Sequence, residues 1–293
     1  GRVMANNFFT IPPGASFALS LARGLIDQTA GDPMALSRMT ILLPTRRACR
    51  TLSDAFLSQS RGRALLLPTT TPIGDLGSDE NEISEYAECA GAEIAEIPPA
   101  IPQLRRRLML TRLILQKAEA EGDIHHTPAQ AAELAAELAR LLDQVQTERL
   151  TFEDLNGLVP DDYAVHWQIT LDFLKIVTEA WPAVLAEIGC LDPAERRNRV
   201  IAARIDAWRA APPADPVIAA GSTGTIPATA DLIAAVAELP AGQIVLPGLD
   251  TALEDDTLGH LGPTHPQFGM VSLLKRFALR PGQVKIWPGA QIP

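Results

Sequence analysis

The stretch Met39-Thr40-Ile41-Leu42-Leu43-Pro44-Thr45-Arg46-Arg47 decides the fold class. Its unbroken apolar run is typical of a β-strand covered on both faces, and Pro44-Thr45 ends the run before a helix predicted over 46–58. An earlier segment has the same order, with a strand over Phe8–Ile11, a turn at Pro12-Pro13-Gly14 and a helix capped by Ser16. This succession predicts parallel strands joined by right-handed crossovers, and therefore an α/β fold.

A further strand is expected over Ala64–Leu67. Strand and helix signals alternate again near the end of the chain. Strands are predicted there over 216–220 and 243–246, and helices over 227–238 and 269–277. Residues 72–100 are rich in Gly, Pro and acidic residues, which indicates a solvated connection.

Between the two groups of strands, residues 102–210 show only helical periodicity. The first expected helix carries Leu104, Leu108 and Leu115 at helical spacing, which predicts an apolar face. Because strand signals flank this block, we expect one α/β domain interrupted by a helical insertion. The predicted boundaries are 4–100 with 211–293 for the α/β domain and 101–210 for the insertion.

Composition and charge narrow the class of protein. Of the 293 residues, 47% are hydrophobic, and the net charge is −10, the reverse of a typical nucleic-acid-binding surface. Any DNA contact must therefore be local or shared with a partner. The chain has three widely spaced cysteines and no recognisable signal peptide, which favours a cytoplasmic protein. It also has no run of about 20 apolar residues, so no membrane contact is expected. Gly1-Arg2-Val3 precede Met4, where the natural chain is expected to start.

The first turn has the position of a phosphate-binding loop but not its chemistry. Such a loop needs backbone N–H donors, a lysine for the terminal phosphates and a hydroxyl for magnesium. Here the loop residues are Pro13, Gly14, Ala15 and Ser16, and the first lysine of the chain is Lys117. Because proline lacks an N–H, we interpret this turn as a degenerate nucleotide loop and favour an ordinary βα turn over phosphate binding.

A second turn, at Thr45, Arg46 and Arg47, follows the central predicted strand. Ligands of open α/β sheets bind at this end of the strands. A hydroxyl and two guanidinium groups at a helix N-terminus suit a phosphodiester oxygen. A surface cap with solvated arginines is the alternative, and the residues do not decide between the two.

The third turn is Gly221-Ser222-Thr223-Gly224-Thr225, directly before a predicted helix. Its hydroxyl and N–H groups suit a phosphate. An equal alternative is a tight turn in which Thr225 caps the following helix. The second and third turns give the DNA-contact candidates of the chain, Thr45, Arg46, Arg47, Ser222, Thr223 and Thr225.

Other polar groups give weaker signals. The arginine clusters at 105–107 and 196–199 are expected on solvated helix faces. His125, His126 and His265 lack partners at metal-ligand spacing, and Asp161-Asp162 suit a helix start. No hydrolase signature occurs. We predict no catalytic residue, no metal site and no cofactor in this chain.

A series of ordered segments resembles the N-terminal region of AddB, in its alphaproteobacterial double-strand break repair type. The resemblance covers nearly the whole chain from about Phe8 to Phe277. The segments are FTIPPGAS (9–16), ILLPTRRACRTL (41–52), LLDQVQT (141–147), HWQITLDFLKIVTEAW (166–181), LDPAERRNR (191–199), VIAAGSTGTIPAT (217–229), VLPGLD (245–250) and HPQF (265–268).

The resemblance implies a P-loop-NTPase fold of the superfamily-1 helicase type, interrupted by an all-helical insertion subdomain. It also implies a partner, the AddA motor subunit, and contact with DNA ends or single-stranded DNA during recombinational repair. Members of the family carry a C-terminal nuclease with an iron–sulfur cluster and magnesium, which is expected to lie outside this chain. The prolines and the missing lysine of the first turn depart from a working nucleotide site.

Three functions remain open from the sequence. The leading one is a non-catalytic scaffold that guides DNA and binds a partner; the others are an ATP-dependent helicase or ATPase, and a protein-interaction module without DNA contact. The leading hypothesis requires the turns at Pro13, Thr45 and Ser222 to share one sheet edge, with Ile11 and Leu43 on neighbouring strands.

Overall fold

The computed structural model describes residues 5–32, 34–73, 96–120, 122, 127–151 and 175–291. The chain divides into two compact units. The first, residues 1–93 with 201–293, is called the sheet unit below, and residues 94–200 are called the insertion unit. The predicted α/β class is confirmed, because the sheet unit contains a six-stranded, fully parallel sheet.

The sheet has the strand order β3-β2-β4-β5-β1-β6. The strands are β1 (Phe8–Ile11), β2 (Thr40–Leu43), β3 (Thr69–Pro72), β4 (Val217–Ala220), β5 (Gly242–Pro247) and β6 (Lys285–Ile286). The central strands β1, β2, β4 and β5 are largely buried, as expected for a parallel sheet covered on both faces. The whole insertion unit lies in the connection between β3 and β4.

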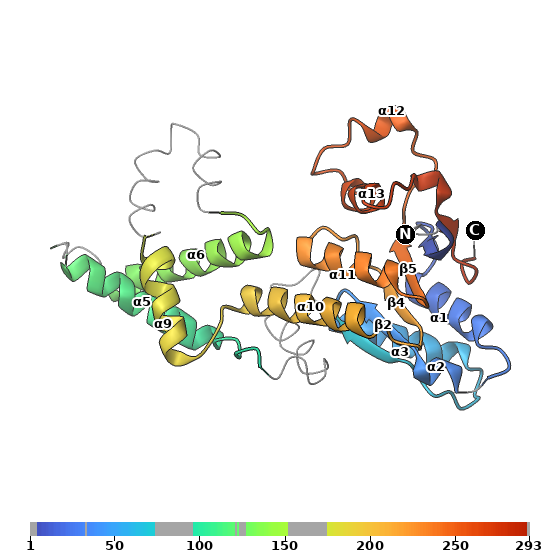
Figure 1. Ribbon diagram of the computed structural model, residues 1–293, viewed down its shortest axis with the longest axis horizontal. Helices are drawn as coiled ribbons and strands as arrows, with labels where there is room; N and C mark the ends of the chain where they lie inside the picture. The colour runs from blue at the N-terminus through green and yellow to red at the C-terminus, as the bar shows by residue number, and fades with distance from the viewer. Residues whose placement is uncertain are drawn as a thin grey trace. The chain divides into compact units, whose positions relative to one another are not determined.

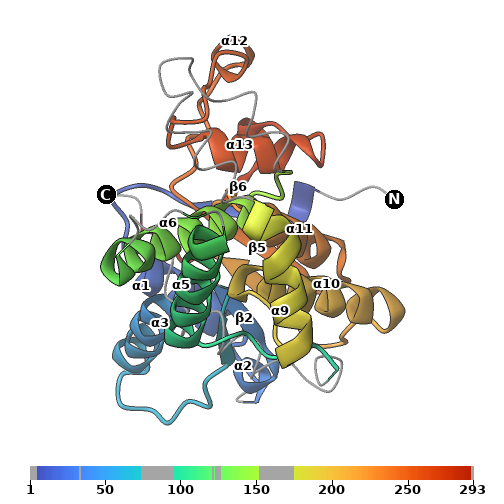
Figure 2. The ribbon, with the colours of Figure 1, turned by 90° about the vertical axis from the view of Figure 1, so that its left-hand side faces the viewer.

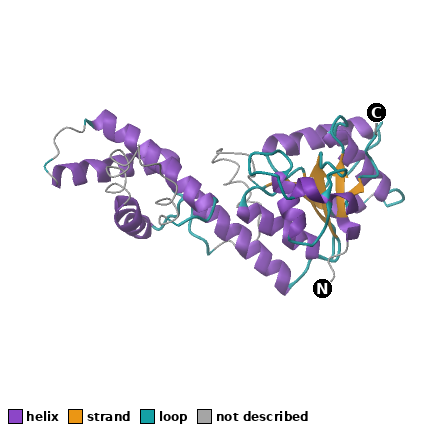
Figure 3. Ribbon diagram, turned by 90° about the horizontal axis from the view of Figure 1, so that it is seen from above, coloured by secondary structure: helices purple, strands orange, loops and turns teal. Residues whose placement is uncertain are grey.

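Helices cover both faces of this sheet. Right-handed crossovers place α1 and α3, which contact each other, on one face and α11 on the other (Figure 1), and Figure 3 shows helices on both sides of the strands. The helices of the sheet unit are η1 (Ala5–Asn7), α1 (Phe17–Gln28), α2 (Ala35–Arg38), α3 (Arg46–Gln59), α11 (Pro227–Glu238), α12 (Asp255–Leu258), α13 (Phe268–Lys275) and η5 (Pro281–Gln283). The helix predicted over 227–238 is confirmed.

Several local predictions for the sheet were wrong. The segment 64–67 is not a strand: Leu66 is exposed, and the third strand follows it as Thr69–Pro72, a run of β-branched residues paired with β2. The short strand β6 was not predicted. Ile11 and Leu43 do not lie on neighbouring strands, because β4 and β5 lie between β1 and β2.

The segment that carries β6 is fixed to α1 by one buried tryptophan. Trp287 has no exposed surface, and its indole Nε1 donates to the carbonyl of Ser20 at 2.9 Å. Its ring lies directly over Gly24, where an added Cβ would stand 2.3 Å from the indole nitrogen. Phe9 of β1 makes an edge contact with the same ring, at 5.3 Å between centroids. The glycine in the middle of α1 is therefore required for close packing.

The insertion unit is helical in its described residues. Its helices are α5 (Gln103–Ala120), α6 (Pro128–Thr147), the π-helical turn η4 (Ile176–Ala180), α9 (Trp181–Ile188) and the first part of α10 (Pro193–Ala210). Thr127 begins α6 with a capping box, since its hydroxyl accepts from the N–H of Gln130 and the Gln130 side chain accepts from its N–H. Figure 2 shows α5 beside α6, and these helices are in contact.

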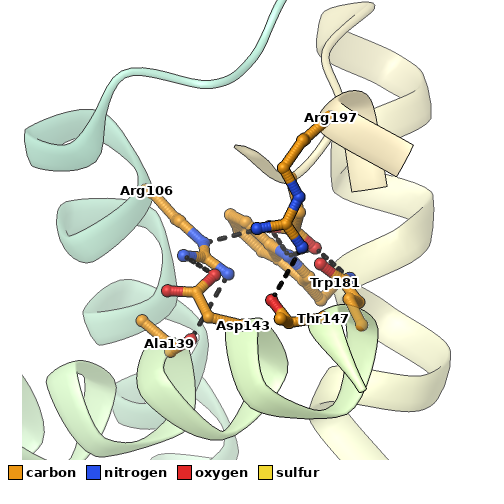
Figure 4. A network of polar contacts seen from close by, with 8 residues as sticks. Arg106, Ala139, Asp143, Thr147, Trp181 and Arg197 are labelled. Atoms are coloured by element: carbon orange, nitrogen blue, oxygen red, sulfur yellow. Dashed lines mark hydrogen bonds and ion pairs between the residues drawn. The ribbon is translucent and has the colours of Figure 1, made fainter. Parts of the chain in front are cut away.

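A buried ionic network joins these helices (Figure 4). The guanidinium of Arg106 lies 2.9 Å from a carboxylate oxygen of Asp192 and 2.8 Å from one of Asp143. Asp192 also accepts hydrogen bonds from the indole of Trp181 and from the Gln146 amide. Arg106 and Asp192 are almost completely buried, so each compensates the charge of the other.

A second buried arginine belongs to the same region. Arg197 is 5% exposed and donates to the hydroxyl of Thr147 at 3.1 Å. The prediction of solvated faces for the two arginine clusters was therefore wrong for Arg106 and Arg197, although Arg105, Arg107 and Arg199 are exposed. Periodicity cannot reveal a buried charge, because its partners come from distant helices.

The apolar face predicted for the first helix of the insertion is also wrong. Leu104 and Leu108 are 70% and 61% exposed. The side of α5 that faces α6 carries instead Arg106, Leu110, Ile114 and Ala118. Leu110 and Ile114 belong to the apolar core of the unit, with Trp181 and Leu185 of α9.

Some predictions lie outside the described residues. They concern Met4 as the start of the chain, most of the connection 72–100, Cys89, His125, His126 and Asp161-Asp162. Within the described residues, no helix combines the length and the apolar character needed to cross a membrane.

The contact between Gly24 and Trp287 predicts that the effect of Gly24→Ala on the free energy of unfolding depends on whether Trp287 is present. Gly24→Ala is expected to lower the free energy of unfolding by about 1–3 kcal/mol, because the new methyl group overlaps the indole. In a Trp287→Ala background, the same change should be neutral or stabilising by up to about 1 kcal/mol, since alanine is the better helix former. Urea unfolding of the four proteins measures both values, and equal effects of Gly24→Ala in the two backgrounds would contradict the packing described.

The carboxyl group of Asp143 predicts a pH effect in the insertion unit. Burial raises the pKa of Asp143 above its ordinary value of 3.8, although Arg106 acts in the opposite direction. The folded state therefore takes up this proton at a higher pH than the unfolded state. As the pH falls from neutral towards 3.8, Asp143 should add stability, and below that value the gain should be complete.

Asp143→Asn, which removes the titrating group, should lack this increment. Urea unfolding of both proteins, followed at several pH values between 7 and 4, gives the difference in stability, with Asp206→Asn on α10 as an exposed control. A difference between wild type and Asp143→Asn that does not change with pH would refute the assignment.

Candidate functional site

The carboxyl ends of the four central strands bring the three turns to one edge of the sheet. Turn 12–16 follows β1, turn 44–47 follows β2 and turn 221–226 follows β4. Because all strands are parallel, these turns must lie at the same edge, called the carboxyl edge below. The expectation that the turns at Pro13, Thr45 and Ser222 share an edge is confirmed.

A topological switch point lies between β2 and β4. From β2 the chain continues through α3 to β3 at one side of the sheet, whereas from β4 it continues through α11 to β5 in the other direction. Ligands of open α/β sheets bind where neighbouring strands diverge in this way. The neighbouring turns 44–47 and 221–226 therefore occupy the position at which a ligand is expected.

A cavity of about 440 Å³ opens at this point, between the N-terminal ends of α1 and α3. Its volume is within the range of about 300–1,000 Å³ that is usual for small-ligand sites. Apolar side chains form most of its wall, and its described polar side chains are the hydroxyls of Ser16, Thr45 and Thr51 and the guanidinium of Arg47. The apolar part of the wall includes Phe17, Pro44 and Leu52.

Gly221 keeps the wall of this cavity compact. Its backbone is in the left-handed region at φ +82°, and an added Cβ would lie 3.3 Å from the Phe17 ring and 3.4 Å from Pro44. Its N–H donates to the carbonyl of Val245 at 3.0 Å. Gly221 of the third turn thus lies against Phe17, which begins α1 directly after the first turn, and against Pro44 of the second turn, so the three segments adjoin.

The second turn presents one open cation. Thr45 has extended backbone angles and caps α3, because its hydroxyl accepts from the N–H of Ala48 at 3.0 Å. Arg47 is exposed, lines the cavity and makes no ion pair with any described residue. No acidic residue occupies the first turn of α3 or the described cavity wall. An anion at this point would meet both a guanidinium and the positive end of a helix.

The first turn differs from a phosphate cradle in its backbone. Gly14 adopts φ +94°, and the N–H of Ala15 donates back to the carbonyl of Pro12 at 3.3 Å. Ser16 stands at the N-cap position of α1, but its side chain makes no capping bond, contrary to the prediction. With two prolines and one N–H already bonded, the turn offers few donors to a triphosphate.

The third turn is partly internal. Ser222 is 3% exposed, and its hydroxyl accepts from the N–H of Gly224 at 3.2 Å. Thr225 is exposed but does not cap α11, because the N-cap position belongs to Ile226. Gly269 of α13 lies against this turn, where an added Cβ would stand 2.7 Å from Thr225. Thr223 and Thr225, rather than Ser222, are the groups that a ligand can reach.

A fourth loop completes the carboxyl edge and was not among the predicted site residues. Thr10, fully buried in β1, donates to the carbonyl of Leu246 at 3.1 Å and accepts from the N–H of Leu249 at 3.0 Å. The amide of Gln267 binds the same loop, donating to Gly248 and accepting from Asp250. The HPQF segment is the sequence signal for these hydrogen bonds, because it contains Gln267.

Within the described residues, no group of three or more His, Cys, Asp or Glu side chains is placed to bind a metal ion. The chemistry of the carboxyl edge is therefore that of a hydroxyl-bearing apolar cavity with a guanidinium at its rim. Such a surface has the groups needed to hold and orient a ligand. It contains no described pair of groups arranged as nucleophile and base.

Comparison with known proteins assigns the chain to no family. A scan against protein-family models finds no match, and no curated protein matches the chain. The similarity to AddB therefore rests on the segments of sequence quoted above, and the function it implies is treated as a proposal.

Proposed function

We propose that this chain is a non-catalytic, helicase-like scaffold of the AddB type, which guides a DNA strand and binds a motor partner of the AddA type. The proposal places the DNA strand along the carboxyl edge, in recombinational repair of double-strand breaks. A P-loop-NTPase ancestry for the sheet unit, with the insertion unit as its helical subdomain, belongs to the same proposal.

The cavity at the switch point between β2 and β4 is the observation that carries this proposal. Arg47 is exposed at its rim, and no carboxylate occupies its described wall. Phosphate contacts fix the position of a nucleic-acid strand, while apolar and aromatic surfaces such as Phe17 receive bases. A net charge of −10 is the reverse of a typical DNA-binding surface, so the proposal needs a local contact, and a cation in an acid-free cavity provides one.

The first turn favours a scaffold over an ATP-dependent enzyme. The alternative of an ATPase requires an ammonium group near the turn, and the chain has no lysine before Lys117. The described lysines of the sheet unit are Lys275, which ends α13, and Lys285, which begins β6 and donates to the Asn6 side chain, and neither belongs to the turn at 12–16. A scaffold requires only that the turn keep its place at the edge, which Gly14 and the Pro12 carbonyl achieve.

The role of Arg47 predicts a change in salt dependence. With a labelled single-stranded oligonucleotide, Arg47→Ala should weaken binding and make the slope of log K against log salt shallower by about 0.7, the value for one phosphate contact. Arg50→Ala is the matched control, because Arg50 is an exposed arginine on the same helix that does not line the cavity. Equal slopes for the two variants would remove the cavity from the DNA path and would favour a protein-interaction module.

The degenerate turn predicts the absence of nucleotide binding. Isothermal titration of the chain with ATP and magnesium should show no affinity tighter than about 1 mM, because lysine and backbone donors are missing. Micromolar affinity would overturn the scaffold in favour of the ATPase. The experiment is independent of DNA, so its result also separates the two functions.

A further inference from the structure

A second stripe of side chains on α5 is exposed at its N-terminal end. Leu104 and Leu108, 70% and 61% exposed, are followed on the same side of the helix by Thr111 and by the half-buried Leu115, part of which packs against the apolar core of the unit. The spacing of four, three and four residues is that of the a and d positions of a coiled coil. The stripe extends over about three helical turns and lies apart from the side of α5 that faces α6.

Arginines flank this stripe on both sides. In the heptad set by the leucines, Arg105 and Arg112 occupy e positions and Arg107 occupies a g position, which are the positions that determine the choice of partner helix. All three are exposed, and none forms an ion pair with a described residue. The only carboxylate of α5 is Glu119, beyond the end of the stripe. The flanks are therefore uniformly positive.

We propose that Leu104, Leu108, Thr111 and Leu115 form a docking seam for an amphipathic helix of a partner protein whose flanking residues are acidic. The proposal rests on the partner-binding part of the function proposed above and gives it a surface; the DNA-binding part is independent of it. A helix with leucines at a and d covers the exposed stripe, and glutamates at e and g pair with the three arginines.

Two other occupants fit the chemistry less well. A second copy of the same helix would place arginines opposite arginines, which opposes pairing. A DNA backbone would bring phosphates to the arginines but would leave Leu104 and Leu108 in contact with charged groups. The combination of an apolar centre with cationic flanks selects an acidic amphipathic helix.

A designed peptide tests the seam directly on the full chain. The probe is a labelled helical peptide of four heptads with Leu at a and d and Glu at e and g, and its match carries Lys in place of Glu. Fluorescence anisotropy should show the acidic peptide binding at least about tenfold more tightly than the basic one. Leu104→Ser with Leu108→Ser should weaken binding of the acidic peptide by about tenfold or more, because the two leucines that the peptide would cover are lost.

Leu57→Ser is the matched control, because Leu57 is 63% exposed on α3 of the sheet unit. It should leave peptide binding unchanged. Arg105→Glu with Arg112→Glu should reverse the preference, so that the basic peptide binds more tightly. A general structural role of α5 would not produce this reversal.

The proposal is overturned if the acidic peptide does not bind, if both peptides bind equally, or if the leucine variant binds as the wild type does. Dimerisation of the wild type that the leucine variant abolishes, measured by sedimentation, would assign the seam to a second copy instead. Oligonucleotide binding by the same preparations separates the two proposals. DNA binding without peptide binding overturns only the seam, and peptide binding without DNA binding overturns only the DNA path.

Discussion

Parallel pairing of β4 with both β2 and β5 determines the position of every group at the carboxyl edge. Val217–Ala219 pair with Thr40–Leu42 on one side, and Val217–Ala220 pair with Gly242–Val245 on the other. Since β2 comes from the start of the chain and β4 from beyond the insertion unit, this pairing joins two segments far apart in sequence. The turn after β4 is thereby placed beside the turn after β2, and Gly221 comes against Phe17 and Pro44. Without β4 there would be no switch point and no shared cavity.

The cores of the two units differ in the kinds of side chain that they bury. The sheet unit buries apolar side chains, with Leu25, Ile41 and Val245 in one core. The insertion unit adds a buried ionic network in which Arg106 and Asp192 compensate each other. Buried ion pairs add little net stability but are strongly destabilising when one partner is lost, so they favour one arrangement of helices over others. The network turns α5 so that Arg106 faces inward, and as a consequence Leu104 and Leu108 face outward.

The sequence predicted the elements whose signal is local and missed those whose partners are distant. The strand at β2 and the helix at α11 follow from an apolar run and from a proline at the helix start, which neighbouring residues reveal. By contrast, β6 is two residues long and depends on Trp287 packing over Gly24, a contact across almost the whole chain. The predicted edge residues Thr45 and Arg47 were found because turns carry local chemistry. Gln267 and the inward orientation of Arg106 were missed because their partners are defined only by the fold.

A strongly acidic chain can contact a polyanion only where its negative charges are kept away, and the cavity at the switch point meets this condition because its described wall contains no carboxylate. Strand ends and helix N-termini contribute N–H groups and partial positive charge without any basic residue. At the switch point these groups surround a cavity whose described wall lacks carboxylates, so the single guanidinium of Arg47 acts without competition. The same reasoning applies to α5, where acidic residues are absent until Glu119. In both proposed sites the omission of carboxylates, more than the number of cations, would give the surface its selectivity, because attraction at close range depends on local charge rather than on the net charge of the chain.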